Sequence, residues 1–334
     1  MIRARWSHAA ASLRYVFPAL CALALVGCGS DDPSGGDGDG PTAGAGAASS
    51  NGNGNGAGAA SGSGASGSGA SGSGGSGSGA AGGTGQGGGT PGDCSGPRPG
   101  PDNTGVPPGT ELEPSGSIQV TDDGAILENL DITGEVQVLA DNVTIRKVRI
   151  TSGDYYPIRY FDENNTGLVV EDSEIIGTNG DVTSAIAFRD YTARRLNIHG
   201  MADGLKADAN VLIEDCWIHD LSNGEGEHND AVQSTGGKGV TIRHNDLSGA
   251  SNACVQTGDE GAATEDLVVQ CNWLDGGGYA LNIRGTGVTK PKNTQVIDNR
   301  FGHDSAYGPW TIDDENPTVT GNVYDDTDQP IPYP

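Results

Sequence analysis

Residues 211–218 read Val-Leu-Ile-Glu-Asp-Cys-Trp-Ile, and this stretch contains a pattern that the chain repeats nine times. The pattern is an apolar residue, four intervening positions and a second apolar residue. Its occurrences are Leu127/Ile132, Ile145/Ile150, Val170/Ile175, Ala193/Ile198, Ile213/Ile218, Ile242/Leu247, Val269/Leu274, Val296/Phe301 and Val319/Tyr324. The first members lie 18 to 29 residues apart, and a repeat of this length built on short β-rich segments predicts a solenoid.

A further apolar stretch lies between successive pairs and gives each coil two or three short strands. Its copies are Pro157-Ile158-Arg159, Ala185-Ile186-Ala187, Gly204-Leu205-Lys206, Ala231-Val232-Gln233, Cys254-Val255-Gln256 and Ala280-Leu281-Asn282. The sequence of this region shows no heptads, no amphipathic helical window and no Leu-x-x-Leu-x-Leu repeat. It therefore predicts an all-β fold, a β-helix of about nine coils, with an all-β sandwich as the alternative architecture.

Polar residues at equivalent repeat positions are expected to form columns, because neighbouring strands of a sheet lie roughly 4.8 Å apart. One and two positions after the first apolar member, acidic and basic residues alternate from coil to coil. The two columns are Glu128, Arg146, Glu171, Arg194, Glu214, Arg243 and Gln270, and Asn129, Lys147, Asp172, Arg195, Asp215, His244 and Cys271. We interpret them as structural ladders of opposite charges and not as catalytic residues.

The last four coils carry an asparagine three positions after the first apolar member, at Asn245, Asn272, Asn299 and Asn322. Asparagine tolerates the left-handed backbone conformation of a sharp turn, and its amide can bond to copies in the adjacent coils. This column predicts a structural asparagine ladder at a turn.

The first 93 residues predict export and a tether. Three arginines precede an apolar run over residues 15–27, which is too short to span a bilayer permanently and is typical of a signal peptide. The run ends in Leu-Val-Gly before Cys28 and resembles a bacterial lipobox, which implies a signal peptide over 1–27 and a lipid on Cys28; the alternative is a plain signal peptide. Residues 28–93 are rich in Gly, Ser, Ala and Asn, a composition that predicts a disordered tether.

Residues 94–334 form the predicted β-helix domain, which is long enough for one large core. The chain has 44 acidic and 18 basic side chains and a formal net charge of −26, which argues against nucleic acid as a partner. Four cysteines lie in the domain, and export permits disulfides without fixing which of Cys94, Cys216, Cys254 and Cys271 are paired. No CxxC spacing suggests a zinc site.

One group of polar residues fits neither ladder and falls in neighbouring coils. Its members are His199, His219, Asp203, Lys206, His228, Asp230, Gln233 and Gln256. Asp203 and Asp230 are 27 residues apart, as are Lys206 and Gln233, so that each pair is predicted to lie in adjacent coils. We expect the whole group on one stretch of one face, flanked by a loop over residues 222–227.

These side chains can share acid–base chemistry. Two carboxylates one coil apart repel each other, and they either raise a pKa or bind a cation such as Ca²⁺. The hypothesis makes His228 and Lys206 the candidate base or acid and Asp203 and Asp230 the paired acids or metal ligands. His199, His219, Gln233 and Gln256 would then contact the substrate. Such a site suits β-elimination next to a uronate carboxylate, or glycoside hydrolysis by paired carboxylates.

The alternative is that this group is purely structural, because His and Asp at turns often only form hydrogen bonds.

Two other groups of residues are interpreted as structural. The aromatic cluster Tyr155, Tyr156, Tyr160 and Phe161 is expected to pack the end of the solenoid, with sugar stacking as the alternative. The Asp-rich tail after residue 312 is expected to be a solvated cap.

The repeat, the asparagine column and the coil length resemble the right-handed parallel β-helix proteins of the pectate lyase-like superfamily. The stretches Asn103-Thr-Gly-Val-Pro-Pro-Gly-Thr110, Asp203-Gly-Leu-Lys206 and His228-Asn-Asp-Ala-Val-Gln233 resemble secreted bacterial members. The resemblance covers nearly all of residues 98–330 and implies the fold, with right-handed coils. It is specific for the fold and weak for the reaction.

Departures from the enzymes of that superfamily keep the reaction type open. The Arg-x-Pro-x-x-Arg segment of pectate lyases and the Asn-Thr-Asp, Gly-His-Gly and Arg-Ile-Lys motifs of polygalacturonases are absent from the sequence. We therefore expect a monomeric lipoprotein of a Gram-negative outer membrane or cell surface, anchored by its lipid and acting on polysaccharide as a lyase or a hydrolase. The alternative is a non-catalytic carbohydrate-binding, structural or adhesion lipoprotein.

Overall fold

The computed structural model describes residues 94–160, 165–180, 182–222, 228–258, 260, 262–285 and 289–333, which all belong to one unit, Ala81–Pro334. The predictions for residues 1–93, including those for Cys28 and the tether, lie outside the described residues, as does the flanking segment 223–227. Within the described ranges the elements are short strands, and no helix there is available to cross a membrane.

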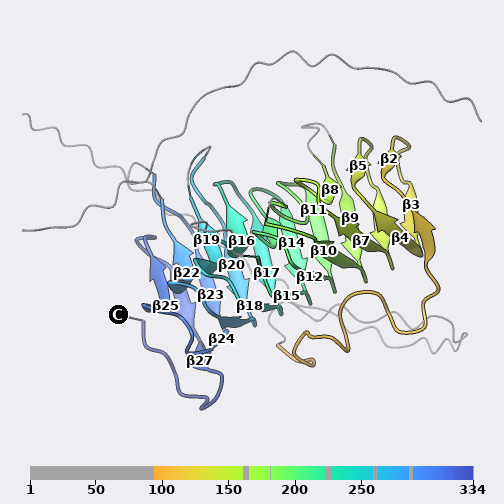
Figure 1. The fold of residues 1–334 in the computed structure, drawn as a ribbon. Helices are drawn as coiled ribbons and strands as arrows, with labels where there is room; N and C mark the ends of the chain where they lie inside the picture. Colours follow the sequence, from red (N-terminus) through yellow and green to blue (C-terminus); the bar gives the residue numbers. More distant parts are fainter. Residues whose placement is uncertain are drawn as a thin grey trace, which may run out of the picture. The chain divides into compact units, whose positions relative to one another are not determined.

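Strands from successive coils pair in parallel, so that two long sheets run through the domain (Figure 1). The ten-stranded sheet contains β1 (Glu113–Ser115), β4 (Leu130–Thr133), β7 (Arg149–Ser152), β10 (Glu174–Gly177), β12 (Asn197–His199), β15 (Trp217–His219), β18 (Asp246–Ser248), β21 (Trp273–Asp275), β24 (Arg300–Phe301) and β27 (Val323–Tyr324). The nine-stranded sheet contains β3 (Ile126–Glu128), β6 (Thr144–Arg146), β9 (Leu168–Glu171), β11 (Tyr191–Arg194), β14 (Val211–Glu214), β17 (Val240–Arg243), β20 (Val268–Gln270), β23 (Gln295–Ile297) and β26 (Thr318–Thr320).

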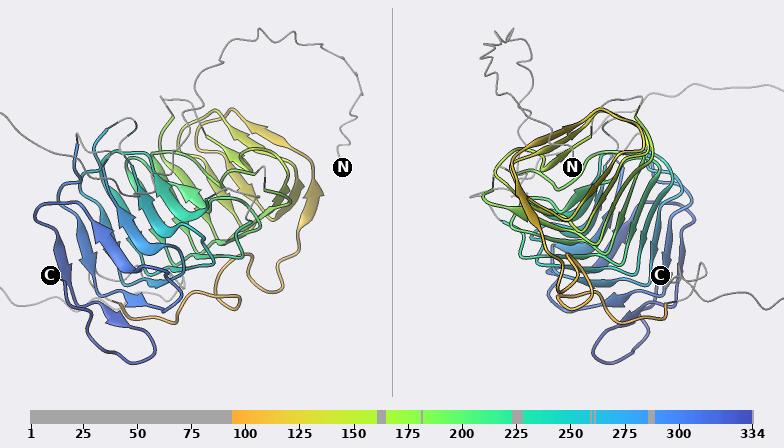
Figure 2. Two further views of the ribbon diagram at one scale, coloured as in Figure 1. Left: turned by 60° about the vertical axis from the view of Figure 1, so that its left-hand side comes forward. Right: turned by 90° about the vertical axis from the view of Figure 1, so that its right-hand side faces the viewer.

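The third side of each coil is formed by two shorter sheets. The three-stranded sheet contains β2 (Ile118–Val120), β5 (Val136–Val138) and β8 (Ile158–Arg159), and the five-stranded sheet contains β13 (Leu205–Lys206), β16 (Asp230–Ser234), β19 (Ala253–Thr257), β22 (Tyr279–Ile283) and β25 (Gly308–Ile312). Ile186 joins the two, because it bridges to Ile158 and its carbonyl accepts the Lys206 N–H at 3.0 Å. The result is a right-handed parallel β-helix with three sides, as the sequence predicted (Figure 2).

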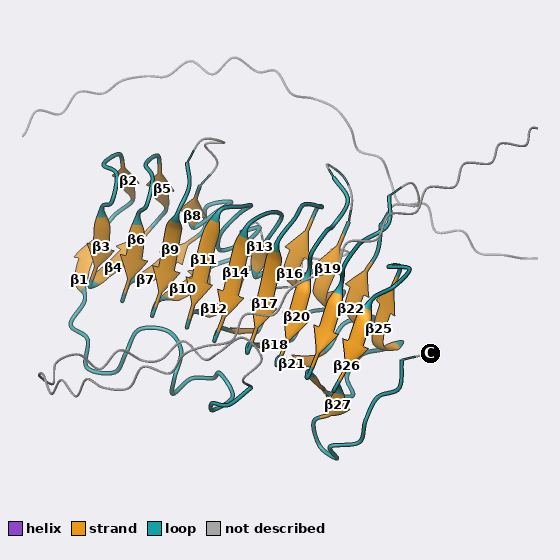
Figure 3. Ribbon diagram, turned by 180° about the vertical axis from the view of Figure 1, so that it is seen from behind, coloured by secondary structure: helices purple, strands orange, loops and turns teal. Residues whose placement is uncertain are grey.

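The nine apolar pairs build the core. Each first member lies in the nine-stranded sheet and each second member in the ten-stranded sheet (Figure 3). Ala193 pairs with Val170 and Ile213, and Ile198 pairs with Ile175 and Ile218, all of them buried. Burying such side chains at roughly 25 cal/mol per Å² is the main stabilisation available to short strands.

The sharp turn between these two sheets lies one position earlier than the asparagine column predicts. Positive φ angles of about 50–60° occur at Asn129, Lys147, Asp172, Arg195, Asp215, His244, Cys271 and Asp298, which is the second charged column and its continuation. We call these residues the turn column. The asparagines follow them with ordinary backbone geometry, so the prediction of a left-handed conformation at the asparagines was wrong.

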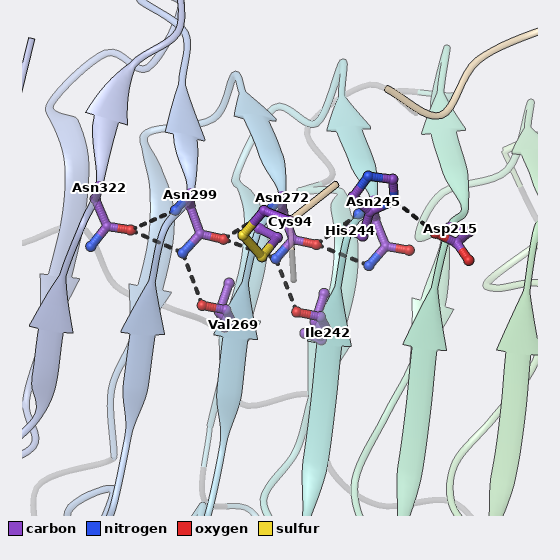
Figure 4. The surroundings of a disulfide bond; sticks show 10 residues. Cys94, Asp215, Ile242, His244, Asn245, Val269, Asn272, Asn299 and Asn322 are labelled. Carbon is purple, nitrogen blue, oxygen red and sulfur yellow. Dashed lines mark hydrogen bonds and ion pairs between the residues drawn. A yellow bond between two sulfur atoms is a disulfide. The ribbon is translucent and has the colours of Figure 1, made fainter. Parts of the chain in front are cut away.

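The asparagine ladder itself is confirmed, with the side chains turned inward (Figure 4). Asn272 Nδ2 donates to Asn299 Oδ1 at 2.9 Å and to the Ile242 carbonyl at 2.9 Å, and Asn272 Oδ1 accepts from Asn245 Nδ2 at 2.9 Å. The ladder satisfies backbone groups that the turn leaves without a strand partner. Buried polar groups of this kind are costly when they are left unpaired.

The charged columns form ion pairs along the outer surface. Glu214, which is buried, bonds to both Arg194 and Arg243, and Arg195 bonds to Asp172 at 2.6 Å. At the C-terminal end, Arg300 pairs with Asp325 at 3.2 Å and with Asp328, and Ile331 packs against the core. The Asp-rich tail is therefore a cap held by an arginine.

Candidate functional site

The outward face of the five-stranded sheet carries one continuous row of polar side chains. Lys206 pairs in register with Gln233, Gln233 with Gln256, and Gln256 with Asn282. The preceding residue of each strand, from Leu205 to Leu281, is buried in the core, so strand alternation directs the polar residues outward. We call Lys206, Gln233, Gln256 and Asn282 the polar row; the spacing of 27 residues predicted its first pair.

Lys206 bonds directly to one of the two carboxylates at the start of the row, Asp203, and reaches the other, Asp230, through Gln233. Its Nζ donates to Asp203 Oδ2 at 2.8 Å and to Gln233 Oε1, and the Asp230 backbone N–H donates to Asp203 Oδ1 at 2.9 Å. Asp203 is 6 % exposed and Lys206 is 9 % exposed. An ion pair this well removed from water is held firmly, since loss of either partner leaves an unpaired buried charge. The predicted neighbours Asp203 and Asp230 are thus in contact through the backbone.

Asp230 is the most perturbed acid of the group. Burial, and then the negative charge of Asp203, raise the pKa of Asp230 to about 7. Its Oδ1 accepts from Asn252 Nδ2 at 2.8 Å and its Oδ2 accepts from Gln233 Nε2 at 3.2 Å. A carboxyl with a pKa near neutrality can release or take up a proton at the pH where most enzymes work. Two adjacent carboxyls in unequal environments are the usual arrangement for acid–base work.

The same contacts bear on the predicted Ca²⁺ site at Asp203 and Asp230. Each of their four carboxylate oxygens already accepts a hydrogen bond, and one of the donors is the Lys206 ammonium. A Ca²⁺ ion needs six to eight oxygen ligands and would have to displace these donors. No cluster of three His, Cys, Asp or Glu side chains suited to a metal occurs in the described part of the chain. The residues as arranged do not fit the ion.

His199 and His219 lie on a different side of the coil from the polar row, in β12 and β15 of the ten-stranded sheet. Their rings stack at 5.1 Å, and Trp217 stacks on His219 at 3.4 Å. His199 faces Glu174 at 3.5 Å, and His219 bonds to Asp220 at 2.7 Å and Asn197 at 2.9 Å. The expectation of one shared face was wrong for these two, because each lies before the turn with which its coil begins the third side; after His199 this turn is at residues 200–203.

His228 precedes Asn229 and β16 and is exposed. It makes no hydrogen bond with another described residue, and its position two residues before β16 places it at the edge of the row and not within it. Gln233 and Gln256 lie in the row as predicted. The site of the sequence hypothesis is therefore reduced to Asp203, Lys206, Asp230, Gln233 and Gln256, with His228 at its edge.

Several residues beside the row were not predicted. Asn252 bonds to Asp230 and to Gln256, and Asn282 Nδ2 donates to Gln256 Oε1 at 2.6 Å. The apolar stretch ending in Asn282 repeats the Gln256 stretch after 26 residues, so the spacing that found Gln233 could also have found Asn282. Asn252 lies outside any repeat position and gave no signal.

Aromatic side chains lie at both ends of the row. Tyr156 contacts Phe188 at 6.0 Å, and the pKa of Tyr156 is raised to about 12 by burial, by Tyr155, and by the nearby Asp203 and Asp208. The Tyr155 side chain is 62 % exposed beside it, while Phe161 of the predicted cluster lies outside the described residues. Tyr160 is buried in the core beside β8, in the third coil, so the expectation that this cluster packs the end of the solenoid was wrong.

The second aromatic group is at the C-terminal end of the row. Tyr279 and Tyr307 are 5.5 Å apart, and the Tyr307 side chain is 75 % exposed. Five strand-to-strand steps separate the coil of β8, near Tyr156, from β22, which begins at Tyr279, a distance of roughly 24 Å at about 4.8 Å per step. The row and its two ends thus form an elongated polar and aromatic surface.

Comparison with known proteins finds one similar structure and no family. No protein-family model matches this chain, and no curated protein matches it. One solved structure is similar, the A-module of the Azotobacter vinelandii mannuronan C-5 epimerase AlgE6, at 10 % sequence identity and a TM-score of 0.43. The match covers 61 % of this chain and 65 % of that one, slightly less than two thirds of the module. The β-helix assignment here rests on the chain's own sheets and register.

Proposed function

We propose that the β-helix domain acts on a polysaccharide that lies along the polar row. The observation that carries this proposal is the pair of linked carboxyls beneath the row, one bonded to Lys206 and the other with a pKa near 7. An elongated row of amide side chains between exposed tyrosines suits a chain of sugar rings, since amides bond to hydroxyls and aromatic rings pack against the apolar faces of sugars.

Two reaction types fit these groups, and both use Asp230. In glycoside hydrolysis, protonated Asp230 gives its proton to the glycosidic oxygen as the bond to the anomeric carbon breaks, and a water molecule adds to that carbon and gives a proton to His228. In β-elimination, ionised Asp230 or His228 accepts the proton next to the carboxylate of a uronate, and the Lys206 ammonium neutralises that carboxylate. The electron pair of the broken C–H bond forms the new double bond, the C–O bond to the next sugar breaks, and the leaving oxygen takes a proton from water. In both, Lys206 and Asp203 position Gln233 and Asp230, and Gln233 and Gln256 bond to the substrate.

A second candidate function, binding without catalysis, is favoured by the burial of Asp230. Its side chain is 1 % exposed and both its oxygens have donors, so that a substrate reaches it only when Asn252 or Gln233 moves. In that case the Asp203–Lys206–Asp230 network supports a carbohydrate-binding or adhesive surface.

A scan of the purified protein against acidic and neutral polysaccharides separates the two. Unsaturated product, detected by ultraviolet absorbance, indicates a lyase, and new reducing ends without it indicate a hydrolase. Asp230→Asn and Lys206→Met are expected to lower the rate by about 10²–10⁴-fold, the usual contribution of a positioned acid or base. Asp266→Asn, an exposed acid that bonds to Asn293 on another side of the coil, is the matched control and is expected to leave the rate unchanged. No product from any glycan, with binding that survives Asp230→Asn, would support the binding function instead.

The cofactor and the location of the protein remain predictions. Ca²⁺ binding at Asp203 and Asp230 is tested by adding EDTA and then Ca²⁺ to an active preparation. Because all four carboxylate oxygens already accept hydrogen bonds, we expect no change in rate.

We also propose that Cys28 carries a lipid that anchors the chain to an outer membrane or cell surface, on the sequence pattern alone. Cys28→Ser is then expected to abolish palmitate labelling and to release the protein from the membrane fraction.

A further inference from the structure

The arginine at the C-terminal end of the polar row has an unusual environment for this chain. The chain has a net charge of −26, and its basic side chains are widely engaged in ion pairs with acids. Arg284 is exposed and makes no ion pair with any described residue. Its guanidinium lies 5.8 Å from the ring centre of Tyr279, which holds it beside the row. A guanidinium that has no carboxylate partner in the described part of a strongly acidic protein is suited to bind an external anion.

Three further side chains complete a place for one sugar ring. Asn282 and Arg284 alternate with buried Leu281 and Ile283 and share the outward face, and Tyr307 extends beside Tyr279. Asn282 Oδ1 is buried and has no hydrogen-bond partner among the described residues, although the amide nitrogen bonds to Gln256. A buried acceptor without a donor is costly, so a rotation of the Asn282 side chain that brings this oxygen to a sugar hydroxyl would be favoured.

We propose that Tyr279, Asn282, Arg284 and Tyr307 form a subsite for an anionic sugar, with its charged group on Arg284 and its ring on the tyrosines. The inference rests on the proposed function in that the same glycan runs along the row. β22 is two strands from β16, so the subsite lies roughly 10 Å from Gln233 at about 4.8 Å per strand. The subsite selects acidic glycans at a distance from the reacting bond.

Calorimetric binding of matched tetrasaccharides to the full chain tests this subsite. A uronate, a sulfated and a neutral tetrasaccharide are compared on the wild type, on Arg284→Gln and on Lys290→Gln, an exposed control whose partner is Glu315. We expect the anionic ligands to bind at least about tenfold more tightly than the neutral one, and Arg284→Gln to remove this preference while Lys290→Gln keeps it. The uronate and sulfate arms identify which anion is preferred.

Equal binding of neutral and anionic ligands, or equal effects of the two substitutions, would overturn the subsite. The outcome is separable from the proposed reaction, because Asp230→Asn is expected to bind the uronate as the wild type does. If product forms and neither its formation nor binding depends on Arg284, the proposed subsite is wrong and the proposed reaction stands. If binding depends on Arg284 but no glycan yields a product, the proposed reaction is wrong and the subsite stands.

An independent observation concerns residues 94–112, which we call the strap. The strap runs lengthwise across the coils before the chain enters β1 (Figure 1). Cys94 forms a disulfide with Cys271, Gly96 lies against His244, and the Gly105 N–H donates to the Arg195 carbonyl at 2.9 Å. All three contacts are made to the turn column.

The strap lies close to the coils and is held by charges as well. A Cβ on Gly96 would come within 3.1 Å of the His244 ring, and one on Gly105 within 3.0 Å of Asn197 Cβ, so glycine permits the approach at both positions. Arg98 bonds to Asp246 at 2.6 Å and pairs with Asp325 of the C-terminal cap at 3.2 Å. The strap therefore connects the two ends of the solenoid.

We propose that the Cys94–Cys271 disulfide is the joint that carries mechanical load between residues 1–93 and the β-helix. Cys94 directly follows the predicted tether, so a pull on the tether reaches Cys271 through the disulfide. The coils between residues 95 and 270, which hold the polar row up to Gln256, then lie outside the path of the force. Without the disulfide, the same pull would peel the strap from the turn column one contact at a time.

Single-molecule force spectroscopy on the full chain, held at its two termini, tests this joint. The disulfide spans 177 residues, so reductant is expected to add roughly 580–640 Å of extension on complete unfolding, at about 3.3–3.6 Å per residue. Cys94→Ser is expected to behave like the reduced wild type and to yield first at a lower force, with release of the strap. Equal extension with and without reductant, or an unchanged first unfolding force in Cys94→Ser, would overturn the proposal.

Discussion

The buried carboxyl of Asp230 makes the stability of the molecule depend on pH. It lies beside Asp203, and its pKa is raised to about 7. The Asp230 carboxyl accepts hydrogen bonds from the neutral amides of Gln233 and Asn252, whereas the Lys206 ammonium donates to Asp203. Because the ionised form of Asp230 is desolvated, the folded protein holds the proton more tightly than the unfolded chain does.

This raised pKa predicts a pH dependence of stability. The folded state binds more protons than the unfolded state between about pH 4 and pH 7, so Asp230 lowers the free energy of unfolding as the pH rises through that window. The loss is on the order of 4 kcal/mol, at about 1.4 kcal/mol per unit over roughly three units. Urea unfolding of wild type and Asp230→Asn at about pH 4.5 and pH 7.5 measures it, since the amide does not titrate. A difference between the two proteins that is equal at both values would contradict the shift.

Glu174 predicts the opposite dependence. Its hydrogen bond with His199, together with Arg149, lowers the pKa of Glu174 to about 2 despite partial burial. The stabilisation is present above the ordinary carboxyl pKa and is lost as the pH falls toward 2. Glu174→Gln is expected to reduce the acid sensitivity of unfolding below about pH 4, as measured by circular dichroism during an acid titration. Glu113→Gln, at the edge strand β1 and exposed, is the control and is expected to leave the acid transition in place.

At the scale of the elements, a strand of three or four residues is held by its neighbours in register and by the turn that follows it. The turn column places a left-handed residue after eight strands of the nine-stranded sheet, and Gly321 takes this place after the ninth, β26. In the last four coils the asparagine ladder then bonds the freed backbone groups. Strands this short have little stability of their own, so the buried side-chain amides maintain the register between coils.

Removal of a ladder member is expected to destabilise the fold by at least about 2 kcal/mol. Asn272→Ala leaves the Asn245 N–H and the Ile242 carbonyl buried without partners, and each such group costs about 1–3 kcal/mol. Asn316→Ala is the matched control, since this asparagine is exposed, its backbone does not have a positive φ, and its side chain makes no hydrogen bond with another described residue; it should change stability by less than about 0.5 kcal/mol. Chemical denaturation of both variants measures the difference, and similar losses would contradict a structural role for the ladder.

At the scale of the molecule, the strap and the disulfide connect the start of the described chain to its late coils and its C-terminal cap. The core forms one continuous stack from the first coil to the cap at Ile331. The disulfide joins Cys94, the first residue of the strap, to Cys271 in a late coil. Cys216 and Cys254 remain free and are buried in the core, where burial raises the pKa of Cys216 to about 12. They are therefore unreactive packing residues in the folded protein.

The loop of 177 residues predicts a large effect of reduction on stability. The chain-entropy relation gives about 5 kcal/mol for closing a loop of this size in the unfolded state. The midpoint of thermal or urea unfolding is expected to fall on addition of reductant to the wild type and to stay constant for Cys94→Ser. An equal response of the two proteins to reductant would point to another disulfide.

The sequence predicted the part of the candidate site that repeats at a constant coil length, but not the direction in which the chain turns at each corner. The constant spacing of 27 residues identified Asp203 with Asp230 and Lys206 with Gln233, because a coil that repeats in length repeats in direction. It gave no direction for His199 and His219, each of which lies before the corner that leads to the third side of its own coil and therefore faces another side. Asn252 and Tyr307 reach the row from loops, where spacing carries no information about position.

The sequence by itself determined the fold of this protein, because nine apolar pairs at coil spacing have one way to share a core. It also determined which charges belong to ladders, since alternating signs at a fixed repeat position need only stacking to meet. The tertiary structure alone decided the turn geometry, the pairing of Cys94 with Cys271 and the separation of the histidines from the polar row. These depend on the direction of the chain at each corner and on a strap that crosses many coils, and neither is encoded in any local spacing.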